Sequence, residues 1–470
     1  MSKIVSSHQQ FSISEFDQVG NDVARYIHST SEEKHRIDVI VSPKNEKSDY
    51  VRNLIEVFLP VGFPGSVTAD YLPLYLLKIF PGIGVGDSTV SPTSALLLSV
   101  LQVSIGRLAT VLFAHRLGTS IEPECKMYRF AADILNDSAL ILDCLSPIFP
   151  RVWRLPFWCL SSVLRSTCGV AAGSSKASLS AHFATQGNLG ELNAKDSSQE
   201  TVISLLGMLV GSLLLPYISS QKMTWVWLIL LLIIHLRTNY LAVRSICLRT
   251  FNRQRANIFF SEVIQKLNNV EPNLLIEKEY SNDSLRNSIW YLDLPSPSYI
   301  SQKEKIFERD GVLRWKNSSA LGYCKLGVSL KSILDCFGCS DVKTGSYSSL
   351  HSHQFQQLLN IYKDSGYILC YSKSQKTYLV AIKSHIKSEV EVHLKAWTQA
   401  LYLAKFELST DGPDSNSTSL IQAYQRTCKF ADQLVNSVIS SPSFAKLGWN
   451  LEISAMETIP GTRFSYGIRA

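Results

Sequence analysis

One apolar stretch, residues 201–236, constrains the fold more than any other feature, because Lys222 is its one charged residue. As a helix rising about 1.5 Å per residue, Thr201–Gln221 is long enough to cross a hydrocarbon core about 30 Å thick. Met223–Leu236 is shorter, and its length alone is more typical of a buried core helix. The residues after it could prolong the span, because the charged end of Arg237 can reach the headgroups.

The two segments together predict a helical hairpin that turns at Pro216–Lys222 and inserts into a membrane. Ser197 and Glu200 fit the pattern of a capping box, which predicts that the first helix begins there. The alternative is a pair of buried helices in a large soluble core.

Two GxxxG motifs lie in the same apolar region, at Gly169 and Gly173 and at Gly207 and Gly211. Glycines one turn apart let helix backbones approach closely, which is a common way for helices to associate in lipid. The motifs therefore favour a packed helical bundle.

Hydrophobic residues make up 46% of the chain and charged residues 18%, against about 25% charged in an average soluble domain. This composition excludes a disordered chain and a small disulfide-linked scaffold. The net charge of +7 lies mostly within the apolar region, which favours a membrane flank over nucleic-acid binding. The first residues are polar, so we do not expect a secretory signal there.

A basic segment follows the apolar stretch without an intervening acidic residue, and it contains Arg237, Arg244, Arg249, Arg253 and Arg255. Apolar side chains interleave with these arginines at roughly helical spacing, which predicts a basic helix at the cytosolic face of a membrane. Each basic residue near an anionic surface contributes about 1 kcal/mol to binding. A nucleic-acid-binding helix is the alternative.

We expect a mainly α fold, a helical membrane-associated bundle followed by a small α+β C-terminal domain. The expected parts are a polar N-terminal region at residues 1–50, a helical membrane core at 51–265 and a soluble α+β domain at 270–470. Residues 36–41 alternate in polarity and predict a strand within the first part.

The expected α+β domain contains clear local signals. Tyr367–Tyr371 and Thr377–Lys383 predict a β-hairpin. Ser388 and Glu391 form a second capping box, which predicts a helix over Ser388–Leu408. Another amphipathic helix is predicted at Ser419–Ile439.

Asp133, Asn136 and Asp137 lie three or four residues apart, which places them on one face of a helix that is otherwise rich in apolar residues. Carboxylates on such a helix are costly in lipid and usually face a cavity or a partner. We therefore treat these residues as a candidate site for a proton, a cation or a polar ligand. The alternative is an interfacial helix whose carboxylates pair with arginines.

A polar stretch within the apolar region contains Lys176, Lys195 and Asp196, which we include as candidate ligand-binding residues. A loop with routine capping is the alternative. Gly82–Asp87 is rich in glycine, but it lacks the GxGxxG spacing of a dinucleotide site, so it predicts a turn before a helix.

Cys336 and Cys339 form a CxxC pair, and His351 and His353 could complete a Cys2His2 zinc site. No second ligand pair follows at the usual spacing, so we expect reduced thiols in an intracellular protein and no metal. No Ser/His/Asp or Cys/His set can be assembled from the sequence. We therefore assign no catalytic residue, expect a protein that is not an enzyme, and leave any cofactor unknown.

Several segments resemble the root UVB-sensitive (RUS) family. The matching runs are Phe58–Pro73, Gly82–Asp87, Phe130–Ser138, Gly169–Leu179, Asn193–Gly207 and Asn239–Asn252. Their order and spacing agree with the family, whereas the C-terminal domain matches it only in general pattern. Where the family tends to have a Lys-Asp-Gly run and a Gly-Arg pair, this chain has Gln102-Val103-Ser104 and Ala109-Thr110. We therefore carry over no ligand role that those positions have in relatives.

The resemblance implies links to UV-B responses, seedling development, auxin transport and vitamin B6 balance in plants, with members working in complexes. Animal and fungal relatives are similar to membrane proteins. Our leading hypothesis is an integral protein of an intracellular membrane that acts in transport or complex assembly. Its expected partners are the lipid membrane and another RUS-family protein or a second copy of itself, without nucleic acid.

Two other hypotheses remain open. One is a protein or enzyme that binds a small molecule such as a vitamin B6 vitamer, resting on Lys176, Lys195 and the Gly82–Gly86 turn. The other is an adaptor that acts through residues 270–470.

Overall fold

The computed structural model describes residues 11–17, 20–31, 34–41, 93–218, 220–270, 282–316, 320–341, 346–347, 352–407 and 417–468, with residues 57, 60 and 66–67. The chain divides into a helical unit, Ala69–Leu248, and an α+β unit formed by Met1–Thr68 with Arg249–Ala470. The fold is mainly helical with a C-terminal α+β region. The glycine-rich turn expected at Gly82–Asp87 lies outside the described residues.

The unit boundaries differ from the expected ones in two places. Residues 1–50, expected to be a separate polar region, contribute three strands to the sheet of the α+β unit. Residues 253–265 were expected in the helical core. They lie instead in a helix, Arg253–Val270, that belongs to the α+β unit. Both differences arise from pairings with residues that are distant in sequence.

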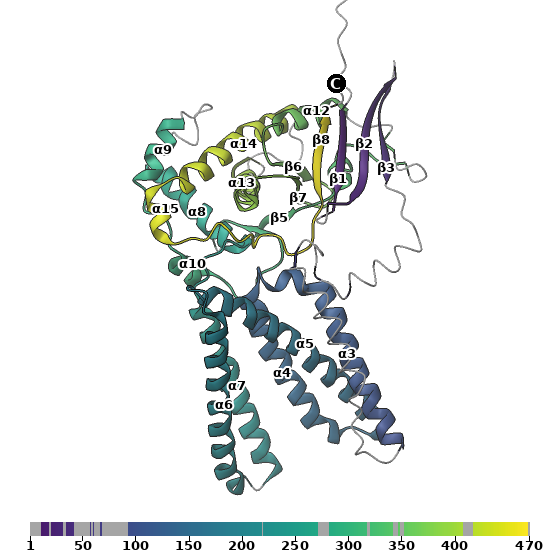
Figure 1. Ribbon diagram of the computed structural model, residues 1–470, viewed down its shortest axis with the longest axis vertical. Coiled ribbons are helices and arrows are strands. Elements are labelled where there is room, and N and C mark those ends of the chain that lie inside the picture. The colour runs from purple at the N-terminus through teal and green to yellow at the C-terminus, as the bar shows by residue number, and fades with distance from the viewer. Residues whose placement is uncertain are drawn as a thin grey trace, which may run out of the picture. The chain divides into compact units, whose positions relative to one another are not determined.

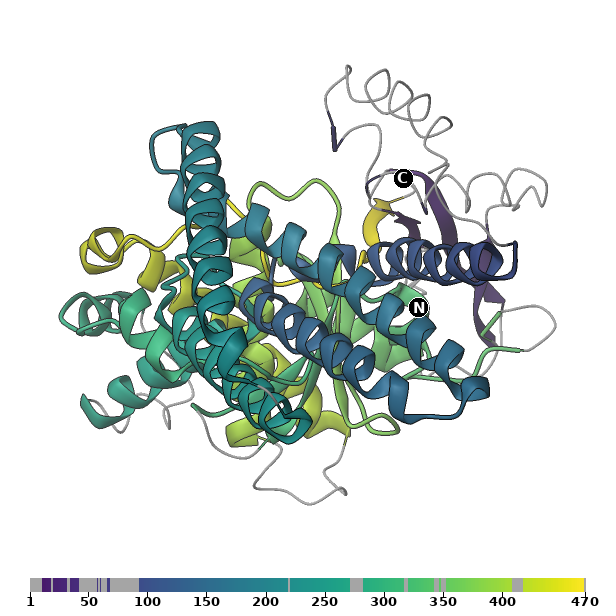
Figure 2. The same ribbon diagram turned by 90° about the horizontal axis from the view of Figure 1, so that it is seen from below.

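Three helices pack side by side in the helical unit (Figures 1 and 2). They are α3 (Thr93–Ile121), α4 (Cys125–Leu145) and α5 (Arg151–Phe183), with a 3-10 turn, η1 (Ser146–Ile148), between the last two. A small apolar cluster of Ile121, Tyr128, Ala132 and Ala171 joins all three helices. Ser161 Oγ also donates to the Ala139 carbonyl across the α4–α5 contact, at 3.2 Å.

Gly106 is the point of closest approach between α3 and α5. A Cβ placed on Gly106 would lie 2.6 Å from Ser162 Oγ and 2.7 Å from Ser166 Oγ. The same Ser162 hydroxyl donates to the Gln102 carbonyl of α3 at 3.0 Å. Glycine therefore lets two helix surfaces meet and form an interhelical hydrogen bond here.

The two GxxxG motifs do not play the predicted packing role in the described structure. A Cβ placed on Gly169, Gly173, Gly207 or Gly211 would meet nothing within 4 Å. The prediction failed because the motif specifies a small-residue face but not whether another helix covers it.

The predicted helical hairpin is confirmed. It consists of α6 (Leu189–Leu214), a 3-10 turn, η2 (Leu215–Tyr217), and α7 (Gln221–Ser245). Ser220 caps α7, because its hydroxyl accepts a hydrogen bond from the Met223 amide at 3.3 Å.

The capping box predicted at Ser197 and Glu200 is wrong, because α6 already begins at Leu189. The Ser197 carbonyl instead accepts a hydrogen bond from Thr201 Oγ1 at 2.9 Å. Glu200 pairs with Lys176 of α5 at 2.8 Å. The Glu200 carboxylate, which the capping-box pattern had assigned to the start of the helix, therefore forms an ion pair with a distant residue instead.

Much of the apolar surface of the hairpin is exposed. No residue within the described range of α6 is buried, and Val243 is the buried residue of α7. The large exposed apolar side chains are Leu189, Val202, Ile203, Leu205, Leu206, Met208, Leu209, Val210, Leu213 and Leu214 of α6, and Met223, Val226, Trp227, Ile229, Leu230, Leu231, Ile233, Ile234 and Leu241 of α7. Among the described helices, these two are long and apolar enough to cross a membrane.

The α+β unit contains a mixed sheet in the order β3-β2-β1-β8-β7-β5-β4, with β6 paired to β7 (Figure 1). The strands are β1 (Phe11–Phe16), β2 (Asp22–Ser31), β3 (Lys34–Val41), β4 (Val312–Arg314), β5 (Ala320–Leu326), β6 (Tyr367–Ser372), β7 (Thr377–Lys383) and β8 (Arg463–Ile468). The predicted strand at residues 36–41 and the predicted hairpin, now β6 and β7, are confirmed. The β7–β8 and β5–β7 pairings are parallel and the others are antiparallel.

Helices of varied length complete this unit. They are α8 (Arg253–Val270), α9 (Asn282–Trp290), α10 (Pro297–Lys303), α11 (Leu330–Leu334), α12 (Ser352–Ile361), α13 (Glu389–Tyr402), α14 (Ser417–Ile439) and α15 (Pro442–Leu447), and a π-helical turn, η4 (Leu403–Glu407), extends α13. Ser388 caps α13 by accepting from the Glu391 amide, as predicted.

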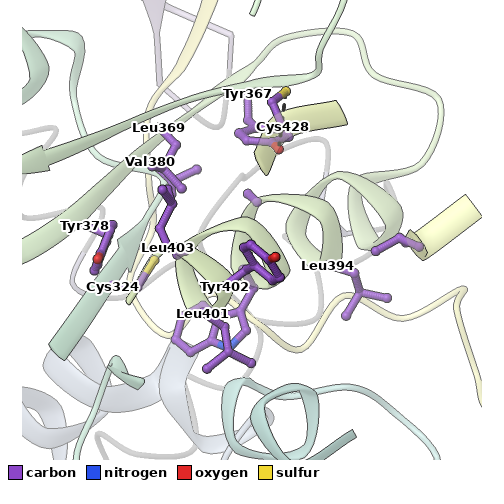
Figure 3. Packing of buried hydrophobic residues seen from close by; sticks show 14 of the residues in the cluster. Cys324, Tyr367, Leu369, Tyr378, Val380, Leu394, Leu401, Tyr402, Leu403 and Cys428 are labelled. Atoms are coloured by element: carbon purple, nitrogen blue, oxygen red, sulfur yellow. Dashed lines mark hydrogen bonds between the residues drawn. The ribbon is translucent and has the colours of Figure 1, made fainter. Parts of the chain in front are cut away.

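The core of the α+β unit forms where α13 packs on the sheet and α14 packs on α13. Figure 3 shows Leu403, directly after α13, close to the strand residue Val380, with Leu401 and Tyr402 of α13 further from that strand. Fully buried Trp397 donates from Nε1 to Asn257 Oδ1 of α8 at 2.8 Å. Asn257 in turn donates to the Val312 carbonyl of β4 at 2.8 Å. The core therefore fixes three elements through satisfied polar groups as well as apolar contact.

The basic helix predicted after the apolar stretch is interrupted. Helix α7 ends at Ser245 and α8 begins at Arg253, with the intervening chain bridging Thr250 to Asn450. Arg255 is buried and pairs with Glu304 at 2.7 Å. Arg255 therefore belongs to the core of the α+β unit and not to a basic helix that continues α7.

A second buried cluster joins α13 to β8. His393 Nε2 lies 3.4 Å from Glu457 Oε1, and Glu457 Oε2 lies 2.9 Å from Arg463 Nη2. Burial opposes ionisation of Glu457, but its contacts with His393 and Arg463 outweigh that effect and lower its pKa to about 2. Glu457 is therefore a carboxylate whose charge stabilises the folded state.

The close approach at Gly106 predicts a contrast between two glycine substitutions in α3. Gly106→Ala should destabilise the helical unit by about 1–3 kcal/mol, because the added methyl collides with two serine hydroxyls. Gly118→Ala is the matched control, since a Cβ there meets nothing within 4 Å, and it should be neutral or gain up to about 1 kcal/mol. Thermal unfolding in detergent measures both, and equal effects would contradict the proposed contact.

The low pKa of Glu457 predicts a pH dependence with a definite sign. The pKa of Glu457 in the folded state lies below the ordinary pKa of a glutamate. The stability that its charged carboxylate contributes is therefore complete above the ordinary pKa and is lost as the pH falls towards about 2. The stability difference between the wild type and Glu457→Gln should narrow by about 3 kcal/mol over that interval. Unfolding measured across the acid range tests this, and a constant difference would refute it.

Candidate functional site

The polar cluster between α4 and α7 is the candidate functional site, because it combines buried carboxylates with a histidine in an apolar helix. Asp137 is buried on α4, and its Oδ2 lies 2.9 Å from His235 Nδ1 of α7. Asn239, one turn further along α7, places its Nδ2 2.9 Å from His235 Nε2. Helices α4 and α7 contact each other in the helical unit (Figure 1).

The two ring nitrogens of His235 have different partners. Asp137 on one side and Asn239 on the other fix the orientation of the imidazole. A histidine held beside a buried carboxylate is an arrangement suited to holding or passing a proton.

Asp133 provides a second carboxylate one turn before Asp137. Its Oδ1 lies 2.9 Å from Arg129 Nη1. Its Oδ2 is buried and has no hydrogen-bond partner among the residues that the structure describes. An unsatisfied buried acceptor is costly, so this oxygen is the group in the cluster with capacity for a further polar ligand or proton.

Aromatic contacts hold the two helices in register beside this cluster. Phe130 of α4 and Tyr240 of α7 meet edge to face, with their ring centroids 5.6 Å apart. The Arg244 guanidinium lies 6.0 Å from the centre of the same tyrosine ring. Phe130 lies three residues before Asp133 on α4, and Tyr240 directly follows Asn239 on α7. The contacts therefore join the two helices within the same region as the polar cluster.

The three candidate residues of α4 do not share one environment. Asp133 and Asp137 are buried, whereas Asn136 is exposed. The helix turn places the amide away from the α7 contact. The alternative predicted for this helix is also present in part, because Arg129 pairs with Asp133 and Arg165 pairs with Asp143 at 2.5 Å.

The other candidate ligand residues form a separate group between α5 and α6. Lys176 Nζ lies 2.7 Å from Asp196 Oδ2 and 2.8 Å from Glu200 Oε1. Lys195 is exposed on α6. The structure therefore brings Lys176 and Asp196 together, but places them in a surface ion-pair network apart from the Asp137–His235 pair.

The five arginines after the apolar stretch divide into two groups. Arg237 and Arg244 lie exposed on α7, and Arg249 is exposed after it. Arg253 pairs with Asp310, and Arg255 pairs with Glu304, within the α+β unit. The side chains of the last two are at most 10% exposed, so they are not available to lipid headgroups.

No group of three or more His, Cys, Asp and Glu side chains could hold a metal ion among the described residues. Of the conceivable zinc ligands, His351 lies outside the described residues, as does the side chain of His353. Cys336 and Cys339 are free thiols.

Sequence reasoning missed His235 and Asn239. Both lie where an apolar run gives way to polar residues, and a neutral histidine does not interrupt a count of charged residues. The sequence did contain a signal for them. His235 is an ionisable side chain within a membrane-length apolar segment, and Asn239 follows it one helical turn later.

Comparison with known proteins adds an independent line of argument. Residues 74–267 match the family model described as "Vitamin B6 photo-protection and homoeostasis domain". This range includes every residue of the α4–α7 cluster and extends into α8. No solved structure matches the chain.

Curated relatives match over the same part of the chain. "RUS family member 1" of Dictyostelium discoideum is 32% identical over 281 residues, covering 56% of this chain and 49% of its own length. "Protein root UVB sensitive 3" of Arabidopsis thaliana is 35% identical over 232 residues, covering 46% of this chain and 52% of its own length. The chain thus spans about half the length of these relatives. Together with the family model, these matches show that the chain belongs to the root UVB-sensitive family.

Proposed function

We propose that the helical unit is inserted in an intracellular membrane through α6 and α7, and that the protein acts there in transport or in a membrane complex rather than as an enzyme. The observation that carries this proposal is the exposure of α6, which is apolar from Thr201 onward and has no buried residue in its described range. A helical segment that is apolar on all sides is stable when protein or lipid surrounds it. Contiguous apolar patches of this kind on soluble monomers are rare and mark interaction sites.

The charge distribution supports a direction of insertion. The first turn of α7 carries Lys222, whereas the other end of α7 carries exposed Arg237 and Arg244, followed by Arg249. Under the positive-inside rule, this arginine-rich end faces the cytosol. The chain that follows α7 is then cytosolic as well.

The Asp137–His235 pair supports the transport role. In the proposed orientation it lies beside the apolar part of α7, where an ionisable group is expensive and is usually retained for function. The oriented imidazole, the buried acid and the unpartnered Asp133 Oδ2 form a group that can accept and release a proton. We therefore assign proton-coupled transport of a polar solute or cation as the activity of this site.

Exposed aromatic and apolar side chains also support a protein partner. Trp153 and Trp158 of α5, and Leu108 and Leu112 of α3, are exposed in the helical unit. Tryptophan suits both membrane interfaces and protein interfaces. We propose that a second RUS-family protein, or another copy of this chain, covers part of this surface.

A second candidate function is binding of a vitamin B6 vitamer, and it rests on the printed description of the matching family model. Lys176 is the amine at the α5–α6 contact, but two carboxylates hold it. A Schiff base there would produce a new absorbance band that Lys176→Arg abolishes. An unchanged spectrum with pyridoxal phosphate would remove this candidate.

The insertion proposal predicts different effects of two arginine substitutions in α7. Ile233→Arg, at an exposed apolar position in the middle of the helix, should cost about 3 kcal/mol of insertion free energy and reduce the carbonate-resistant fraction. Gln221→Arg is the matched control, because its charge lies at the helix end and can reach water. Complete extraction of the wild type by alkaline carbonate would refute insertion.

The site proposal predicts a loss of proton movement. Purified protein in liposomes that contain a pH-sensitive dye should carry protons, and Asp137→Asn or His235→Gln should abolish that flux. Asp196→Asn is the matched control, since it alters an exposed ion pair outside the cluster. Wild-type flux equal to that of empty liposomes, or unaffected by both site variants, would refute the assignment.

A further inference from the structure

A cavity of about 400 Å³ in the α+β unit brings two cysteines to one wall. Cys336 follows the short helix α11, and Cys370 lies on β6. Ser372 of β6 and Tyr424 of α14 line the same cavity. Cys370 is 3% exposed, whereas Cys336 is partly exposed. Both cysteines line the cavity, and Cys336 is the more accessible of the two.

The two thiols are close enough to affect each other's ionisation. Cys336 Sγ donates to the Ser332 carbonyl at 3.5 Å, and Cys370 Sγ donates to the Tyr371 carbonyl at 3.9 Å. The sequence pairs Cys336 with Cys339 in a CxxC motif, but the fold pairs it with a cysteine from a different element.

The two thiols differ in acidity. The interaction with Cys370 is the main cause that lowers the pKa of Cys336, with Ser372 adding to it against the effect of burial. The same interaction and burial raise the pKa of Cys370 well above its ordinary value. Cys336 ionises first, and the thiolate is the nucleophilic form of cysteine.

We propose that Cys336 is an oxidation site for hydroperoxides and that Cys370 resolves the product to a Cys336–Cys370 disulfide. The assignment rests on the position of both cysteines in the lining of one cavity and on the greater accessibility of Cys336. It concerns the α+β unit and is independent of membrane insertion.

The chemistry balances with the hydroperoxide as oxidant. The Cys336 thiolate attacks the outer oxygen of the peroxide and breaks the O–O bond, and the leaving oxygen takes a proton to become water or an alcohol. Cys336 becomes a sulfenic acid. The Cys370 sulfur then attacks the Cys336 sulfur, the S–O bond breaks, and the hydroxide leaves as water with the Cys370 proton. Two thiols have supplied two electrons to the peroxide.

Other cysteines of this unit serve as internal references. Cys339 is exposed and lies three residues after Cys336, so it is the alternative disulfide partner for Cys336. Cys324 is buried in the apolar core, and burial raises its pKa. Cys324 should therefore resist the oxidant that modifies Cys336.

Mass spectrometry of the full chain treated with hydrogen peroxide tests the proposal. The wild type should yield peptides that join Cys336 to Cys370, and dithiothreitol should separate them. Cys370→Ser should lose the linked peptide and accumulate sulfenic acid at Cys336, trapped by dimedone. Cys336→Ser should leave Cys370 unmodified.

Cys339→Ser is the matched control, and it should form the Cys336–Cys370 disulfide at the wild-type rate. A Cys336–Cys339 disulfide as the main product would overturn the proposal. Equal oxidation of Cys336 and Cys324 would do the same, since it would show that the cavity confers no reactivity. The dimedone signal at Cys336 in Cys370→Ser keeps the test decisive if that variant is less stable.

Discussion

The exposed apolar surface of α6 and α7 is the constraint on which the proposed role of the helical unit depends. Side chains such as Leu206, Met208 and Ile233 are exposed among the described residues, and apolar surface of this extent is unfavourable in water. The proposed insertion into lipid would remove this surface from water without a further protein interface. In lipid an ionisable group would be costly, which is why the contact between Asp137 and His235 matters to the proposal.

Hydroxyl groups in the helical unit are satisfied locally, which suits an apolar environment. Thr167 donates to the Val163 carbonyl, Ser212 to that of Leu209, and Thr238 to that of Ile234, at 2.7–2.9 Å. Each bond lies within one helix, so the hydroxyl needs no water or partner. Ser162, in contrast, uses its hydroxyl between helices, at the place where Gly106 removes the side chain that would block it.

Features carried by short sequence intervals could be predicted, and features that depend on distant pairing could not. The apolar length of residues 201–236 and the polar gap within it predict the hairpin. The local alternation around residues 367–383 predicts β6 and β7, and Ser388 predicts the start of α13. The partner of Asp137 lies 98 residues away, and no periodicity states which face of α4 meets α7. Likewise, nothing near Cys336 indicates Cys370, and the capping pattern at Glu200 could not anticipate an ion pair with Lys176.

The pairing of β1 with β8 has a consequence for synthesis. Glu15 of β1 accepts a hydrogen bond from Thr462 at 2.6 Å, and these residues are 447 positions apart. The ribosome therefore adds 447 residues, including the helical unit, between Glu15 and Thr462. During that interval the edge of β1 that later pairs with β8 is open, and a strand of another chain can join it. The distance between β1 and β8 in the sequence thus makes β1 prone to aggregation during synthesis.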